Sequence, residues 1–178
     1  MVNEIIKILA CNGLIAIPTD TIYGACGDPE SKIAVEKLYD LKKRDKNKKL
    51  SILVKDYDEI DKICVMTDFV RNFVYNKLKN NTIILPKKNV NYLNLISDET
   101  IGIRVPNNEF LLNLLKAYDK PIFATSINIT KEKECLYYDD VIKKFNKKFD
   151  FIIKNNTIPS NKSSNIYRII DGIVERIR

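Results

Sequence analysis

Residues 14–24 read LIAIPTDTIYG, an apolar run that stops at Pro18 and continues directly into a polar segment. A short apolar run bounded by a turn signal is typical of a buried strand. Two hydroxyls, a carboxylate and a phenol therefore leave the end of a rigid strand together. Such groups can hydrogen-bond a small polar ligand such as an amino acid. They can equally cap an ordinary turn, and the stretch alone favours the turn.

Similar runs on either side of this stretch alternate with segments of helical spacing. Strands are predicted at residues 50–54, 82–86, 100–106, 120–128 and 149–153, with a hairpin-like pair from Asn165. Helices are predicted at residues 3–12, 30–44, 56–63, 67–79, 108–118 and 138–146. This alternation predicts an α/β fold with a twisted, mixed open sheet flanked by helices. In such a sheet a ligand binds beyond the ends of central strands.

Length and composition predict one domain spanning residues 1–178. The chain is 45% hydrophobic and 30% charged, and no linker or repeat divides it. This composition excludes wholesale disorder and a disulfide-stapled miniprotein. No apolar run approaches the roughly 20 residues of a membrane span, and the first residues do not form a signal peptide. We therefore expect a cytoplasmic protein without a membrane partner.

The charge balance and the missing residue types narrow the chemistry. Lys and Arg exceed Asp and Glu by 30 to 23, which favours a partner that carries phosphate. The excess is largely lysine in a chain rich in Asn and Ile, as an AT-rich genome produces, so charge alone identifies no partner. With no histidine, and no CxxC among its four cysteines, the chain lacks the residues of a zinc site or a histidine-based triad. The spacing of its five glycines matches neither the P-loop motif nor the GxGxxG motif of dinucleotide-binding proteins.

Two segments carry candidate anion-binding side chains. LKKRDKNKKL (41–50) places five lysines and an arginine between a predicted helix and a buried strand. These cations can converge on a triphosphate, or they can form a solvated loop at a helix C-terminus. In TIGIRVP (100–106), Arg104 alternates with apolar residues in a predicted half-buried strand. A buried arginine needs an anion, either a structural carboxylate or the carboxylate of a ligand.

Two further segments end strands in polar groups. Ser126 and Asn128 alternate at the end of KPIFATSIN (120–128), so both point to the same side if the strand continues. Ser163, Ser164 and Asn165 precede the terminal strands, and Arg176 lies near the end of the chain. Each signal is weak individually.

Taken in order, four segments resemble the motifs of the YrdC family of L-threonylcarbamoyladenylate synthases. They are PTDTIYG (18–24), LKKRDKNKKL (41–50), KPIFATSIN (120–128) and KSSNI (162–166). The resemblance runs from about Ile15 to Arg176 and is closest to the short, single-domain form. It implies a YrdC-like domain around a concave basic cleft. It also implies a nucleotidyltransferase reaction that condenses L-threonine, bicarbonate and ATP to threonylcarbamoyl-AMP and pyrophosphate.

The resemblance also implies partners and roles for individual residues. Lys42, Arg44 and Lys48 would bind the ATP phosphates, with Thr100, Ser126, Asn128 and Arg176 also at the nucleotide site. L-Threonine would contact Thr21, Arg104, Ala124 and Ser164, with Arg104 pairing its carboxylate. Mg²⁺ would accompany ATP without protein ligands, and no side chain is assigned as a catalytic acid or base. The product would pass to a downstream transferase complex that makes t6A in ANN-decoding tRNAs, with possible direct tRNA contact.

Two alternatives to the synthase stay open at this point. One is an RNA-binding YrdC-like module that uses the cleft and its charge without chemistry. The other is a paralogue that acts on a different carbamoyl-adenylate. Neither threonine's attack on bicarbonate nor the carbamate's attack on phosphorus requires histidine. Both require alignment and charge neutralisation.

Overall fold

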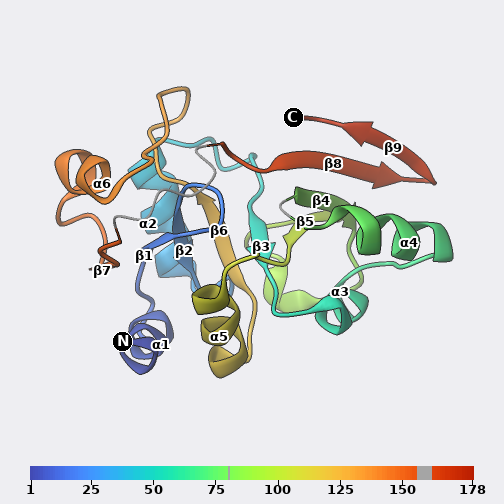
Figure 1. The fold of residues 1–178 in the computed structure, drawn as a ribbon, viewed down its shortest axis with the longest axis horizontal. Helices are drawn as coiled ribbons and strands as arrows, with labels where there is room; N and C mark the ends of the chain where they lie inside the picture. The colour runs from blue at the N-terminus through green and yellow to red at the C-terminus, as the bar shows by residue number, and fades with distance from the viewer. Residues whose placement is uncertain (80, 156–161) are drawn as a thin grey trace.

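The computed structural model describes residues 1–79, 81–155 and 162–178, which form a nine-stranded sheet with helices on both faces (Figure 1). The strands are β1 (Ile15–Pro18), β2 (Tyr23–Gly27), β3 (Ser51–Leu53), β4 (Asn81–Pro86), β5 (Thr100–Arg104), β6 (Ile122–Ser126), β7 (Phe151–Ile152), β8 (Asn165–Ile170) and β9 (Ile173–Arg176). The helices are α1 (Val2–Ala10), α2 (Lys32–Lys42), α3 (Tyr57–Ile63), α4 (Asp68–Lys77), α5 (Glu109–Tyr118) and α6 (Tyr138–Phe145), with a 3₁₀ turn, η1, at Asn91–Leu93. The predicted α/β class is confirmed.

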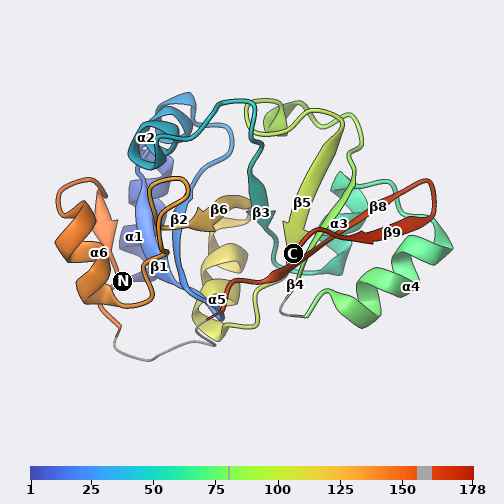
Figure 2. The same ribbon diagram turned by 90° about the horizontal axis from the view of Figure 1, so that it is seen from above.

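The sheet is mixed and twisted, as predicted. Its strand order is β7-β1-β2-β6-β3-β5-β4-β8-β9. The pairs β1–β7, β3–β5 and β4–β8 are parallel, and the other neighbouring pairs are antiparallel. Seen from above, the sheet extends from β7 beside α6 to the β8–β9 hairpin beside α4 (Figure 2).

Both faces of the central strands are buried, which explains their continuous apolar runs. Along β1, Ile15 and Ile17 pack with α1 and α5 on one face, whereas Ala16 belongs to the larger cluster on the other face. The larger cluster includes residues from α2, α3, α4 and α6. In Figure 1, α1 and α5 lie together beside the same part of the sheet.

The predicted elements are confirmed within a few residues, with one strand missed. β2 reads YGACG and is buried throughout, but two glycines and the absence of alternation hide it from pattern analysis. Gly27 allows β2 to approach β6, because a Cβ atom there would lie 2.4 Å from Cζ of Phe123. The β1–β2 register pairs Pro18 with Tyr23, so residues 19–22, three polar residues and Ile22, form the loop of a hairpin.

No helix in the described part of the chain is both long and apolar enough to cross a lipid bilayer.

Candidate functional site

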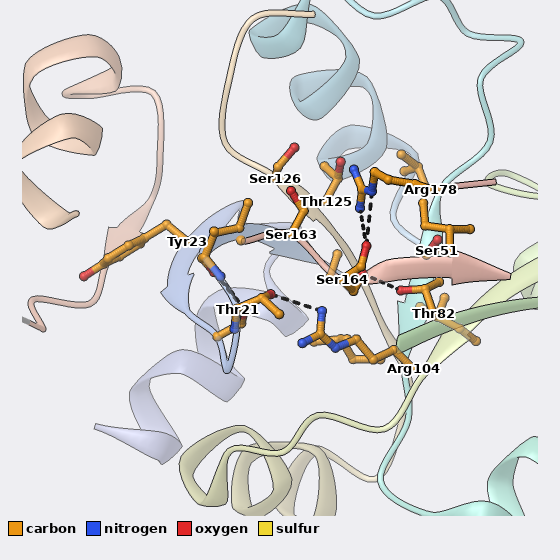
Figure 3. Close-up of a pocket in the computed structure, with 18 of the residues that line it drawn as sticks. Thr21, Tyr23, Ser51, Thr82, Arg104, Thr125, Ser126, Ser163, Ser164 and Arg178 are labelled. Atoms are coloured by element: carbon orange, nitrogen blue, oxygen red, sulfur yellow. Dashed lines mark hydrogen bonds between the residues drawn. The ribbon is translucent and has the colours of Figure 1, made fainter. Parts of the chain in front are cut away.

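A cavity of about 220 Å³ lies where the β1–β2 hairpin loop and strands β3, β5, β6 and β8 come together (Figure 3). Its lining is rich in hydroxyl groups, which belong to Thr19, Thr21, Ser51, Thr82, Thr125, Ser126, Ser163 and Ser164. The hydroxyl of Tyr23 points away from the cavity and donates to the carbonyl of Ile153 (Figure 3). Four cationic side chains complete the lining, those of Arg44, Lys49, Arg104 and Arg178. The cavity therefore offers hydrogen-bonding groups and positive charge to a polar, anionic ligand.

Arg104 ends β5 and enters the cavity as a buried cation, with 7% of the residue exposed. Its Nη1 donates a hydrogen bond of 3.1 Å to Oγ1 of Thr21 (Figure 3). Its Nη2 lies 2.7 Å from Oδ2 of Asp20, an ion pair without hydrogen-bond alignment. Within the described residues, Nε and Nη2 donate no hydrogen bond. Asp20 is therefore the structural carboxylate that a buried Arg104 could require. Nε and Nη2 still have the geometry to donate to a second carboxylate.

The hydroxyl of Thr21 is oriented by the hairpin loop that carries it. Oγ1 of Thr19 donates to the carbonyl of Ile22 at 2.7 Å and lies 3.0 Å from Oγ1 of Thr21. Because the Thr19 proton is directed at that carbonyl, Thr21 donates to Thr19 and offers a lone pair to Arg104. The loop therefore fixes the position of the Thr21 hydroxyl relative to the Arg104 guanidinium.

Ser164 is tied to two neighbours at the start of β8. Its Oγ lies 2.9 Å from Oγ1 of Thr82 on β4, and its carbonyl accepts bonds of 3.1 and 3.0 Å from Nε and Nη2 of Arg178 (Figure 3). Arg176, the predicted site residue, instead donates to Oδ1 of Asn165 at 3.0 Å and is exposed. Arg178 lies two residues beyond Arg176, after the end of β9, and no sequence pattern distinguished it from Arg176.

Arg44, like Lys49, belongs to the basic segment 41–50 and lines the cavity. It follows α2 in a loop, partly buried, and its Nε and Nη2 donate to the carbonyls of Lys48 and Lys49 at 3.1 and 2.8 Å. Burial lowers the pKa of the Arg44 guanidinium. The hydroxyl of Tyr39 also donates to the Lys48 carbonyl, at 2.9 Å, whereas the Lys48 residue is exposed. The loop is therefore held mainly through its backbone.

Lys42 lies beside the cavity rather than in its described lining. The residue is 2% exposed, and its Nζ donates to Oδ1 and the carbonyl of Asn128 at 2.7 and 3.2 Å, and to the carbonyl of Ser126. Oγ of Ser126 donates to the same Oδ1 at 2.9 Å. Burial, with the nearby charge of Arg44, lowers the pKa of Lys42 to about 8. The hydrogen bonds of Lys42 thus connect the end of α2 to the turn that follows β6.

The structure brings together six of the predicted site residues in the cavity lining, namely Thr21, Arg44, Arg104, Ala124, Ser126 and Ser164. Lys42, Lys48, Thr100, Asn128 and Arg176 lie outside the described lining. Thr100 begins β5, whereas Arg104 ends it. Four residue steps along the strand separate the two by about 13 Å. Sequence analysis did not assign Lys49, Ser51, Thr82 or Thr125 to the site. Lys49 and Thr125 lie within two of the quoted motifs but were given no role there, and Ser51 and Thr82 lie outside all four.

This geometry is that of an α/β protein with a polar, cationic cavity at the ends of its central strands, suited to an anionic small molecule. The chain belongs to the Sua5/YciO/YrdC family, since the family model described as "Telomere recombination" matches residues 7–178. The predicted family resemblance is confirmed.

Individual relatives agree with the family. A protein of Methanocaldococcus jannaschii is 32% identical over 178 residues, covering 99% of this chain and 84% of the relative. A Buchnera aphidicola protein named threonylcarbamoyl-AMP synthase is 33% identical over 166 residues, covering 89% of this chain and 93% of its own. The structure of P. abyssi Sua5 complexed with L-threonine superposes with a TM-score of 0.89 at 20% identity. That match covers 99% of this chain and 53% of the other, so this chain spans about half the length of P. abyssi Sua5.

Proposed function

We propose that this protein is a threonylcarbamoyl-AMP synthase that condenses L-threonine, bicarbonate and ATP and releases pyrophosphate. The observation that carries the proposal is the buried guanidinium of Arg104, whose Nε and Nη2 donate no hydrogen bond within the described residues although they lie in a polar cavity. Buried donors are rarely left without acceptors, so a bound ligand or ordered water must supply them. The names of curated relatives support the same activity.

The amino acid fits the end of the cavity that β5 and the hairpin loop form. The Nε and Nη2 donors of Arg104, which make no hydrogen bond within the described residues, suit an α-carboxylate, because a guanidinium edge bonds both carboxylate oxygens at once. The hydroxyls of Thr21 and Ser164 and the backbone at Ala124 lie in the same lining and offer partners to an amine and a β-hydroxyl. The end near Arg104 is thus the threonine subsite of the proposal.

ATP fits the end of the cavity that the basic loop forms. Arg44 and Lys49 line it and would neutralise phosphate charge, and Ser126 would contact the nucleotide. Lys42 and Asn128 would act there by holding Ser126 in place. Lys48, Thr100 and Arg176 lie outside the described lining. They would contact ATP only if ATP binding moved them toward the cavity. No group of three metal-ligating side chains occurs among the described residues, so magnesium would enter with the phosphates of ATP.

The reaction fits these groups because neither step needs a histidine. Threonine's amine attacks bicarbonate, and loss of water leaves a carbamate. A carbamate oxygen then attacks the α-phosphorus and displaces pyrophosphate. Alignment of the reactants and neutralisation of the leaving group supply the rate enhancement. We further propose that the product serves t6A synthesis in tRNA through a downstream transferase.

Incorporation of labelled bicarbonate tests the proposed function. Purified protein with ATP, magnesium and L-threonine should yield labelled threonylcarbamoyl-AMP and an equal amount of pyrophosphate. L-Valine, which lacks the hydroxyl, should give much less product. Salt-dependent tRNA binding without any adenylated product would favour an RNA-binding module instead. ATP-dependent product from another substrate, but not threonine, would favour a paralogue.

A further inference from the structure

Asp20 is a buried carboxylate to which the proposed reaction assigns no role. It lies in the β1–β2 hairpin loop, and its side chain is 5% exposed. Its Oδ2 accepts a 3.1 Å hydrogen bond from the backbone N–H of Asn107. Its Oδ1 has no hydrogen-bond partner among the described residues. A buried carboxylate is costly unless something compensates its charge.

The compensating charge is Arg104. Nη2 of Arg104 lies 2.7 Å from Oδ2 of Asp20, and Nη1 bonds Thr21, the next residue in the chain. One short loop therefore contacts the guanidinium at two of its nitrogens. Thr21 lines the cavity, whereas Asp20 lies outside the described lining. Within the described residues, Asp20 is connected to the cavity through its contact with Arg104.

The contact with Asn107 extends this arrangement to a second segment. Asn107 lies between β5 and α5, three residues beyond Arg104. Oδ2 of Asp20 thus joins the hairpin loop to the segment that follows β5, as well as neutralising the last residue of β5. Turning or withdrawing the guanidinium would separate it from Asp20 and Thr21 together.

We propose that Asp20 is a positioning residue for the amino-acid substrate. It is the resident counter-ion that holds Arg104 with Nε and Nη2 available to the substrate carboxylate. This inference rests on the proposed function, because it concerns the same threonine subsite. In the empty site Asp20 balances the buried cation, and in the complex it fixes the direction from which the substrate carboxylate binds.

The test is steady-state kinetics of Asp20→Asn, which removes the charge and keeps the shape of the side chain. Loss of a charge-assisted contact to Arg104 should raise the KM for threonine by about tenfold or more. The KM for ATP should change by less than about twofold, because the nucleotide end does not contact Asp20. Equal effects on both substrates, or no effect on threonine, would overturn the proposal.

Asp28→Asn is the matched control. Asp28 is also buried, and its carboxylate accepts bonds from the backbone N–H of Glu30 at 2.8 Å and from the hydroxyl of Tyr118. It lies outside the described cavity lining. Its amide variant should leave the KM for threonine within about twofold of the wild-type value. A rise equal to that of Asp20→Asn would mean that the loss of any buried carboxylate has this effect, and would overturn the proposal.

A double-mutant cycle with Arg104→Lys separates positioning from a general structural role. If Asp20 acts through Arg104, adding Asp20→Asn to Arg104→Lys should leave the KM for threonine within about twofold of the single Arg104→Lys value. Effects that multiply would contradict the coupling. If Asp20→Asn does not fold, Asp20→Glu takes its place. A smaller rise in the threonine KM is then expected, and an unchanged KM would overturn the proposal.

Calorimetric binding of L-threonine to the same variants distinguishes this inference from the proposed function. Wild-type protein that binds threonine without forming product would contradict the proposed reaction. The affinities of Asp20→Asn and Asp28→Asn would then decide the role of Asp20. Product formation by the wild type with unchanged threonine affinity in Asp20→Asn would contradict the role of Asp20 alone.

Discussion

The two ends of the cavity hold their arginines in opposite ways. Arg104 is the last residue of a buried strand, and side chains of the neighbouring hairpin loop contact its guanidinium at two nitrogens. Arg44 lies in a loop after α2, is only partly buried, and bonds backbone carbonyls of its own loop. One cation is held between a strand and the neighbouring hairpin loop, whereas the other is held, among the described residues, only by carbonyls of its own loop.

This difference matches what each ligand needs. An amino acid is small, and its discrimination depends on donors held within a fraction of an ångström of their productive positions. A triphosphate is larger and more highly charged, and a loop can adjust around it. We therefore expect substitutions at the threonine end to change stability and amino-acid recognition together. Substitutions in the loop should change nucleotide use alone.

Arg104→Ala should have the largest effect. It leaves Asp20 buried without its counter-ion, and breaking a buried pair in this way costs about 3–5 kcal/mol of unfolding free energy. Threonine-dependent product formation should also be lost. Urea denaturation measures the first effect and the bicarbonate assay the second. A free energy of unfolding within about 1 kcal/mol of the wild-type value would show that the pair does not support the fold.

The buried Lys42, beside the nucleotide end of the cavity, predicts a pH dependence of stability. Its pKa falls from 10.5 to about 8 in the folded protein. Between these values the unfolded chain binds more protons, so stability rises with pH. Relative to Lys42→Met, the wild type should gain about 3 kcal/mol of unfolding free energy as pH rises from below 8 to above 10.5. Urea curves at several pH values check this, and a constant difference between the two proteins would contradict it.

The elements that the sequence predicted well are those with strong periodicity. The run at 14–18, the helix at 108–118 and the terminal pair all appear close to their predicted bounds. β2 was not predicted, because Gly27 is required for close packing against β6 and such a tertiary requirement leaves no local sequence pattern. The motifs identified Arg44 and Arg104 as candidate site residues, but the approach of Asp20 to Arg104 depends on how the hairpin loop meets the end of β5.

Arg44→Ala should affect nucleotide use with little change in stability. Loss of a charge-assisted contact to phosphate predicts an increase of about tenfold in the KM for ATP. The free energy of unfolding should fall by about 1 kcal/mol, because Arg44 is only partly buried and its two hydrogen bonds go to carbonyls of its own loop. Lys46→Ala, in the same loop and exposed, is the control and should behave as wild type. An unchanged KM for ATP in Arg44→Ala would remove Arg44 from the phosphate site.

Lys48→Ala should have the smallest effect. The structure uses its carbonyl, which alanine retains, while the side chain lies in an exposed part of the loop. An exposed charge contributes at most about 1 kcal/mol, so the KM for ATP should rise by less than about fivefold. Steady-state kinetics measures it. A larger effect than that of Arg44→Ala would show that the loop rearranges to bring Lys48 to the phosphates.

The most direct test of the contrast between the two ends is calorimetric titration of L-threonine into three proteins without nucleotide. They are the wild type, Arg104→Lys and Arg44→Ala. We predict that Arg104→Lys binds threonine about tenfold or more weakly than the wild type, because lysine cannot offer the paired donors of a guanidinium. Arg44→Ala should bind threonine as the wild type does. Equal loss of binding in both variants would contradict a rigid amino-acid end that functions independently of the loop.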